Sequence, residues 1–469
     1  MQLFFQIVIT NYFTNTENMI NFKNTHIYVI LVCSFFTSFL VSVFINHPII
    51  GDAYQYFILA ENLFKYGIFS LSESRPIEPT MFREPLYPFF INLIYLIFGK
   101  SILPIYVIQC ILFSLICVLT YCVGLIFFNK KIAFTAGLIL SFLPPLFEYP
   151  GYILTETLFT FLLLSLFLLF YYLIKLNSNI IPLFLGLLLG MLALLKTSSF
   201  FLFFFISIFL ILYSLKSKYY IISFKKILII FLFYIITISP WMIRNYNFFD
   251  TLQIRHGGGG NIWMASQSIE YTQKDILKNV VFNFSEYLGG KIYSEENENK
   301  EYFLFNKQNL VFERERFLRN KGYTDTEINN YLTKEAIQII IKNPVKFFLT
   351  RFLELQKMLA FTYSPTLNQP TVVEYFKEKS NEYILSLIKS PFRIVSYFIF
   401  LISFYSFINL KFSFEKYLIF SFIFYFNFIH SMLFGIGRYS VPIIPFYVVL
   451  FSPFVFLIIT KLRNKFYDR

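Results

Sequence analysis

Residues 47–69 read "HPIIGDAYQYFILAENLFKYGIF" and follow directly after the apolar run "IYVILVCSFFTSFLVSVFI" at 27–45. Asp52 therefore lies just past a segment long enough to cross a bilayer, among tyrosines and near a second acid, Glu61. If 52–66 forms a helix along the membrane, Asp52, Tyr56 and Ala60 share one face and Glu61 points elsewhere. Position alone leaves two interpretations of Asp52, a helix N-cap or solvated loop acid on the one hand and a functional residue on the other.

The composition is that of an integral membrane protein. The 469 residues are 57% hydrophobic and 14% charged, whereas a soluble domain is about a quarter charged. The formal charge of +13 comes from Lys and Arg clustered at the ends of apolar runs, as in topology determinants, so no nucleic-acid partner is expected. All four cysteines lie inside apolar runs without metal-ligand spacing, so we expect free thiols.

Apolar runs of about 20 residues predict ten membrane spans. Two further runs, 85–99 and 343–361, are too short or too charged to cross and are expected to lie in the membrane interface. Pro240 is expected to end the seventh span. The ten runs are 27–45, 102–128, 132–148, 153–174, 179–196, 198–216, 224–241, 391–410, 416–434 and 440–460.

The basic residues predict the topology. Those at 129–131, 175, 216–226, 409–416 and the C-terminal tail fall on one side of a ten-span chain, which the positive-inside rule makes cytoplasmic, together with both termini. The expected fold is an all-α polytopic membrane protein with a small external α-rich domain, whose acid-rich stretch 294–301 is solvated surface. Residue usage suggests an AT-rich, bacterial genome and hence the plasma membrane. The expected parts are a cytoplasmic leader at 1–26, a transmembrane catalytic module at 27–241 with its first outer loop at 46–101, an external segment at 242–390, and C-terminal helices with a basic tail at 391–469.

Acids and cations gather at the expected outer helix ends. Glu156, in "YPGYILTETLF", begins a span, and a carboxylate at membrane depth tends to face a cavity or a partner, although it can also complement the helix dipole. Lys196 suits a snorkelling lysine as well as a site residue. Several cations that oppose the positive-inside trend, together with two acids, predict an anion pocket around a carboxylate base. The candidates are Asp52 and Glu156 as catalytic acids, Arg83, Lys196, Arg244 and Arg438 as phosphate-binding cations, and Tyr54, Tyr56, Asn245 and Tyr439 as lining residues.

The sequence predicts no cofactor. His47 lies close to Asp52 in the chain, but one His and one Asp do not define a metal site, so a divalent metal is left open. The run "HGGGG" at 256–260 does not follow a strand, and a flexible loop is expected there.

The chain resembles the GT-C class of membrane glycosyltransferases, in particular the family 39-like group of protein O-mannosyltransferases and bacterial lipid A aminoarabinose transferases. The resemblance implies a GT-C fold and transfer of a sugar from a polyprenyl-phosphate carrier to an acceptor on the outer face. It also implies that Asp52 is the essential first-loop acid, Glu156 a second acid in the next outer turn, and Arg83 the basic residue before the Pro-Leu motif. Its motifs occur in family order over roughly residues 28–450: "GDAYQYFILAENLFKYGIF", "REPLYPFF", "ILTETLF", "SPWMIRNYNFFDTLQIRHGGGGNIWMASQ" and "GRYSVPIIPF".

This chain also differs from the family pattern. It has a single acid at Asp52 where many protein mannosyltransferases have an adjacent pair, and Lys196 where arginine is common. The acceptor therefore stays open between a lipid, a glycan and a protein. The other expected partners are the polyprenyl-phosphate sugar donor and the membrane lipids.

The chemistry of such a donor points the same way. A sugar on a lipid phosphate already has a good leaving group, so the reaction needs a base for the acceptor hydroxyl. We expect Asp52 to be that base and its apolar setting to raise its basicity. Arginines suit the departing phosphate because their planar fork binds two oxygens at once. A single displacement inverts the anomeric centre, and Glu156 is assigned to acceptor positioning or to a hydrogen bond with the base.

Two other functions share the membrane bulk and the outer cations. A transporter or flippase of a lipid-linked glycan predicts polar residues through the bilayer midplane, whereas the spans here are almost uniformly apolar. An unrelated membrane glycan ligase or polymerase would have a different fold. A GT-C enzyme should bring Asp52 and Arg244 together at one outer cavity.

Overall fold

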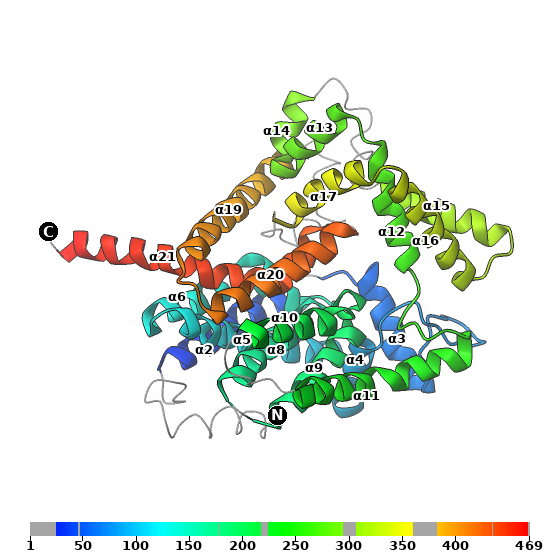
Figure 1. Ribbon diagram of the computed structural model, residues 1–469, viewed down its shortest axis with the longest axis horizontal. Coiled ribbons are helices and arrows are strands. Elements are labelled where there is room, and N and C mark those ends of the chain that lie inside the picture. The colour runs from blue at the N-terminus through cyan, green and yellow to red at the C-terminus, as the bar shows by residue number, and fades with distance from the viewer. Residues whose placement is uncertain are drawn as a thin grey trace.

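The computed structural model describes residues 25–45, 47–176, 178–216, 224–293, 306–359, 382–433 and 435–467. Within these ranges the chain forms helices, turns and loops without a β-strand, which confirms the expected all-α fold (Figure 1). Residues 1–24 of the expected leader, residues 217–223 of the basic group at 216–226 and the acid-rich stretch 294–301 lie outside the described residues.

Six helical segments in the described part of the chain are long and apolar enough to cross a membrane. The bent pair α6 (Lys130–Ser141) and Pro144–Gly151, which contains α7 (Pro144–Glu148) and η1 (Tyr149–Gly151), turns by 57° and can count as a seventh. The six are α2 (Thr25–Phe44), α5 (Leu103–Phe127), α8 (Glu156–Lys175), α11 (Phe224–Phe249), α19 (Glu382–Asn409), and η6 (Gly437–Ile443) continued by α21 (Ile444–Tyr467).

All ten expected spans lie on helices, and among the described residues six of them, or seven with the bent pair, also have the length and hydropathy of a full crossing, whereas three do not. α9 (Ile181–Leu195) and α10 (Leu202–Lys216) have 15 residues each, and at about 1.5 Å per residue they fall short of a hydrocarbon core of about 30 Å. α20 (Phe414–Met432) is long enough but carries Asn427 and His430 as well as charges at its start. A run of apolar letters does not reveal where a helix bends or stops.

Pro240 does not end its helix, contrary to expectation. α11 continues to Phe249, because Pro240 removes only one helical hydrogen bond and the turns beyond it are held from outside. Trp241 Nε1 donates to the carbonyl of Ile254 at 2.9 Å. Asn245 Nδ2 donates to the carbonyls of Gln253 at 2.7 Å and Ile254 at 3.1 Å. The chain after the helix is thereby folded back along it.

The core of the fold is α8, whose apolar window is 94% buried. It packs against α5, α9 and η6, so the residue at its start, Glu156, lies on the most deeply buried of the six candidate spans. α9 packs closely on α11 because Gly186 and Gly190 have no side chains to separate them. This fixes the end of α9, where Lys196 begins the turn to the short helix η2 (Thr197–Ser199).

The segment after the first span forms α3 (Asp52–Tyr66) and α4 (Leu86–Phe98), which pack on each other. The predicted helix 52–66 is confirmed, and so is the expected division between its two faces. Tyr56 and Ala60 are buried, whereas Glu61 accepts from Lys65 and from Lys100, away from Asp52. The second acid that accompanies Asp52 in the sequence therefore belongs to another surface.

The described parts of the long polar segment are largely helical as well, and α17 (Pro344–Leu359) packs on α20 (Figure 1). The helix expected at 343–361 is confirmed, while its place in the membrane interface stays a prediction. The loop expected at 256–260 is wrong, because α12 begins at Gly258. A side chain at Gly259 would meet the Asn329 carbonyl, so glycine lets α12 lie directly on α16. The other helices are α12 (Gly258–Ser266), η3 (Gln267–Glu270), α13 (Gln273–Phe284), α14 (Glu286–Ile292), α15 (Asn306–Asn320) and α16 (Asp325–Lys342).

The contact between α9 and α11 gives a test of the packing. In Gly186→Ala the new Cβ would lie within 3.0 Å of the Ile230 carbonyl oxygen, and backbone cannot move aside cheaply. We expect the free energy of unfolding in detergent to fall by about 1–3 kcal/mol. Gly290→Ala in α14 is the matched control, since its Cβ meets nothing within 4 Å. The control should be neutral or stabilised by up to about 1 kcal/mol. Equal stability of Gly186→Ala and wild type would contradict the packing.

Candidate active site

Asp52 lies between two arginines that come from distant parts of the chain. Its Oδ1 accepts from Arg83 Nη2, and its Oδ2 accepts from Arg438 Nη2 at 2.6 Å. Arg83 is in the loop before α4 and also donates from Nε to Gln55 Oε1 at 2.6 Å. Each carboxylate oxygen is thus bound by its own guanidinium, and hydrogen bonds between ionised groups are the strong ones.

The second acid, Glu156, joins the same cluster through Arg438. Oε1 of Glu156 lies 3.3 Å from Arg438 Nε and accepts from Lys196 Nζ at 3.0 Å. The Glu156 side chain is 1% exposed, and no described residue donates to its Oε2. The expected grouping of both acids with Arg83, Lys196 and Arg438 is therefore seen. With two acids and three cations, these five side chains have a formal surplus of one positive charge.

A third acid, Glu84, contacts residues next to the cluster and helps to hold them in place. Glu84 Oε1 accepts from the N–H and from Oγ1 of Thr197, both at 3.0 Å, and Oε2 lies 3.4 Å from Arg255 Nη1. Burial raises the pKa of Glu84, but the charge of Arg255 and the Thr197 hydrogen bonds outweigh it and lower the pKa. Because Glu84 follows Arg83 and Thr197 follows Lys196, this contact fixes two of the cations relative to each other.

The pKa of Asp52 is shifted in the opposite direction to the one expected, downward and not upward. Burial raises it, but the charges and hydrogen bonds of Arg438 and Arg83 together outweigh burial and hold the pKa well below its usual range. The expectation that apolar surroundings raise the basicity of Asp52 is therefore wrong for this arrangement. As it lies here, Asp52 is an ion-paired carboxylate and a weak base.

Arg244 and Asn245 do not touch Asp52. Arg244 Nη1 donates to the carbonyl of Thr80 at 2.7 Å and to Asn245 Oδ1 at 2.8 Å, and its guanidinium lies 4.7 Å from the Trp241 ring centre. Asn245 is fully buried, and its amide binds the carbonyls of Gln253 and Ile254. These two side chains attach the first loop and the chain after α11 to that helix, so they support the loop that carries Arg83 and do not line the cluster.

Two of the four predicted lining residues border the cluster. Tyr56 is buried with its ring 5.5 Å from the Arg83 guanidinium. The Tyr439 ring is stacked on His430 and lies 5.6 Å from Lys196 Nζ. Tyr54 is 39% exposed and donates to Glu73 at 2.9 Å, on the side of α3 away from Arg83.

The residues around Asp52 do not fit a divalent metal. Both carboxylate oxygens accept from arginines, and the neighbouring side chains are cations that repel a metal ion. His47 is held 3.2 Å from the Val41 carbonyl through Nε2 and packs on the Tyr152 ring. Among the residues that the structure describes, no three His, Cys, Asp or Glu side chains come together in a way that could hold a metal.

Sequence reasoning found the five residues of the cluster and missed Glu84 and Arg255. A signal for Glu84 was present in "REPLYP", where an acid stands beside Arg83 before an apolar helix. Nothing in the sequence pairs it with Arg255, 171 residues away.

The chain is similar in fold and in sequence to known membrane glycosyltransferases. Against solved structures, it matches the archaeal oligosaccharyltransferase AglB from Archaeoglobus fulgidus, in complex with an inhibitory peptide and a dolichol-phosphate, with a TM-score of 0.51 and 14% identity. The match covers 96% of this chain and 52% of AglB. The chain has the GT-C fold of that enzyme. This confirms the expected fold class over nearly the whole chain, which spans about half the length of the relative.

Part of the chain also matches a family of mannosyltransferases in sequence. Residues 78–243 match the family model of dolichyl-phosphate-mannose-protein mannosyltransferases, which confirms the resemblance expected from the sequence. This stretch includes Arg83, Glu156 and Lys196. An A. fulgidus oligosaccharyltransferase tethered to an acceptor peptide with an NVT sequon also matches, at 14% identity over 92% of this chain and 50% of that one, with a TM-score of 0.47. A comparison with curated proteins gives no match.

The ion pairs of Asp52 predict a pH-dependent stability. Because the folded pKa is lowered, Asp52 stabilises the fold fully above its unfolded pKa of about 4, and this contribution is lost as the pH falls below that value. At pH 7, Asp52→Asn should lower the free energy of unfolding by about 1–3 kcal/mol, and the difference from wild type should shrink between about pH 5 and 3. Glu61→Gln on the same helix is the control and should lose less than about 1 kcal/mol. A difference that stays constant down to pH 3 would contradict the pairing.

Proposed function

We propose that this protein is an inverting glycosyltransferase that moves a sugar from a polyprenyl-phosphate donor to a lipid, glycan or protein acceptor on the outer face of the membrane. The observation that carries the proposal is the position of Asp52 between Arg83 and Arg438, with Glu156 and Lys196 completing the cluster. A base and a surplus positive charge at one place suit the two reacting ends of such a donor.

The cations suit the departing phosphate. The cluster has one more positive than negative charge, and a phosphate brings the missing anion. Arg83 and Arg438 each present a fork of donors that matches two phosphate oxygens, which a point charge cannot do. Donors that are already held in place stabilise charge on the leaving oxygen as the sugar–phosphate bond breaks.

Donor binding would itself activate the base. A phosphate that takes hydrogen bonds from Arg83 and Arg438 withdraws them from Asp52, and the burial that now opposes them is left to raise the pKa. Asp52 then accepts the proton of the acceptor hydroxyl while that oxygen bonds to the anomeric carbon and the phosphate leaves with its electron pair. One displacement of this kind inverts the anomeric centre.

The distribution of charge supports a cluster on the outer face. α8 has Glu156 at its start and Lys175 at its end, and α11 has Lys225 and Lys226 at its start and Arg244 near its end. The lysines are thus at the opposite helix ends from the cluster, and the positive-inside rule makes their side cytoplasmic. On this proposal both termini lie in the cytoplasm, and a bacterial plasma membrane is proposed from residue usage alone.

The comparisons support the donor class. The family model is described by dolichyl-phosphate-mannose, and the AglB structure holds a dolichol-phosphate. Both contain a dolichyl phosphate, which is a polyprenyl phosphate, while the inhibitory peptide in the AglB structure is a ligand of AglB alone. The acceptor of this chain stays open.

The test is mass spectrometry of the lipids that copurify with wild type, Asp52→Asn and Glu61→Gln. Asp52→Asn keeps Arg83 and Arg438 but has no base, so it should retain an intact polyprenyl-phosphate sugar and lose about 10²–10⁴-fold in transfer rate. Glu61→Gln, on the same helix but away from the cluster, should behave as wild type.

Two outcomes would count against the proposal. If neither wild type nor Asp52→Asn retains such a lipid from membranes that contain it, a transporter or an unrelated ligase becomes the better reading. If Glu61→Gln loses transfer as strongly as Asp52→Asn, the assignment of the base is wrong.

A further inference from the structure

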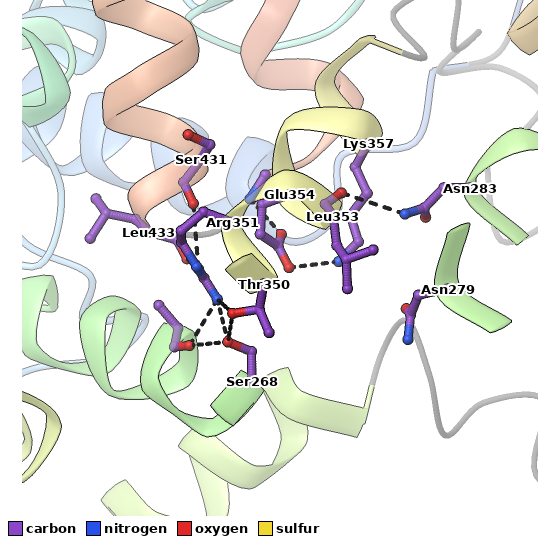
Figure 2. Close-up of polar contacts among 12 residues, drawn as sticks. Ser268, Asn279, Asn283, Thr350, Arg351, Leu353, Glu354, Lys357, Ser431 and Leu433 are labelled. Atoms are coloured by element: carbon purple, nitrogen blue, oxygen red, sulfur yellow. Dashed lines mark hydrogen bonds and ion pairs between the residues drawn. The ribbon is translucent and has the colours of Figure 1, made fainter. Parts of the chain in front are cut away.

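Arg351 is a buried cation on α17 whose hydrogen-bond acceptors among the described residues are neutral groups (Figure 2). The side chain is 3% exposed. Its guanidinium donates to the carbonyls of Leu433 at 3.0 Å, Ser431 at 3.4 Å and Ala265 at 3.0 Å, and to the hydroxyl oxygen of Ser268. A charge at this depth is tolerated only where many acceptors converge on it.

The carbonyls around Arg351 belong to two helix ends. α20 ends at Met432 and α12 ends at Ser266, so Ser431, Leu433 and Ala265 lie at C-terminal ends. Carbonyls there lack helical partners and carry the negative end of the helix dipole. One guanidinium thereby joins the end of α20 to α12 and α17.

Glu354, one turn further along α17, holds the next part of the chain. Its Oε2 accepts from the N–H of Gly435 at 2.9 Å, and its Oε1 accepts from Lys357 Nζ at 3.0 Å. A side chain at Gly435 would lie within 3.0 Å of the Glu354 carbonyl. Main chain is therefore packed directly on main chain, and only glycine fits.

The distance along the chain from Gly435 to Arg438 is three residues. η6 begins at Gly437, and its first turn is closed by the Tyr439 N–H bond to the Ile436 carbonyl at 3.0 Å and the Ser440 Oγ bond to the Gly437 carbonyl at 2.6 Å. Because this connection is short and held by hydrogen bonds, we expect a displacement of Gly435 to displace Arg438 as well.

We propose that Arg351 and Glu354 are positioning residues for the transfer reaction, which hold Arg438 between Asp52 and Glu156 by fixing Leu433 and Gly435. The inference deepens the proposed function and rests on it. Neither residue touches the cluster, so their influence on Asp52 runs through Arg438. Movement of α17 against α20 would change how strongly Arg438 pairs with the base.

The test measures the protonation of Asp52 without any donor. Carbodiimide modifies protonated carboxyls, so its rate of reaction with Asp52, followed by mass spectrometry at pH 5, reports the pKa. The charged and titratable groups near Asp52 are Arg83, Arg438, Glu156, Glu84 and Tyr56. Of these, Glu354→Ala should disturb Arg438 alone.

In Glu354→Ala we expect about a tenfold faster labelling of Asp52, equivalent to a rise of about one pH unit in its pKa. Glu354→Gln keeps an oxygen for the Gly435 N–H and should stay near wild type. Gln356→Ala is the matched control on the same helix, because the Gln356 side chain binds the Val280 carbonyl and not Gly435. Glu354→Ala in an Arg438→Ala background should add nothing, since the effect acts through Arg438.

A purely structural role would look different. If Glu354→Ala lowers the unfolding temperature but leaves Asp52 labelling and the acid limb of the transfer rate at wild-type values, the proposal is overturned. Arg351→Lys, which keeps the charge and removes the fork, is the second variant should Glu354→Ala fail to fold; it too should speed labelling, and an unchanged rate in it overturns the proposal.

The activity readout separates this inference from the function beneath it. With transfer in hand, Glu354→Ala should lower kcat about 10- to 100-fold with little change in the acceptor KM. If wild type neither binds nor transfers a polyprenyl-phosphate sugar, the proposed function fails. The labelling rates still decide whether α17 positions Arg438.

Discussion

The arrangement of this end of the bundle depends on one guanidinium, that of Arg438, which pairs with two acids at once. The Glu156 side chain is 1% exposed and that of Asp52 27% exposed, and burying a carboxylate is costly unless a cation or hydrogen-bond donors pair with it. Because Arg438 meets both, the start of α3, the start of α8 and the turn before α21 are constrained to lie together. The positions of Arg83 and Lys196 follow, since Arg83 binds the Asp52 oxygen that Arg438 leaves free and Lys196 shares Oε1 of Glu156 with Arg438.

The charged side chains of the cluster are also held in place by neighbouring residues, through hydrogen bonds to main-chain groups and one further ion pair. Glu84 binds the turn that follows Lys196 and meets Arg255. Arg244 binds the carbonyl of Thr80, in the loop that leads to Arg83. Arg351 does the same for the end of α20. Removing one partner of a buried polar contact is far more damaging than the contact is stabilising, so these supports make the cluster rigid even where each bond contributes little net free energy.

What could be predicted from the sequence was local. The helix at 52–66, the buried face of Tyr56, and the candidacy of Arg83, Glu156, Lys196 and Arg438 all follow from spacing and from charge at the ends of apolar runs. What could not be predicted depends on which distant residues meet. Arg244 has the same local signature as Arg438, yet its nearest acceptors are carbonyls, so it holds a loop. α11 runs through Pro240 because of contacts with residues 253 and 254. The direction of the Asp52 pKa shift is set by two arginines, one 31 and one 386 residues away in the sequence.

The sharing of Arg438 also distinguishes the two acids chemically. Suppose that a phosphate takes Arg83 and Arg438 from their carboxylates. Glu156 keeps its bond from Lys196 and remains paired, whereas both cations of Asp52 are diverted. Only the carboxylate that loses its partners gains basicity from burial. Under the proposed function, this asymmetry of the contacts favours Asp52 for proton transfer and leaves Glu156 to hold Lys196 in place. On the same proposal, Asp52 becomes a strong base only when a donor phosphate has taken its two arginines, and without a donor it stays an ion-paired carboxylate.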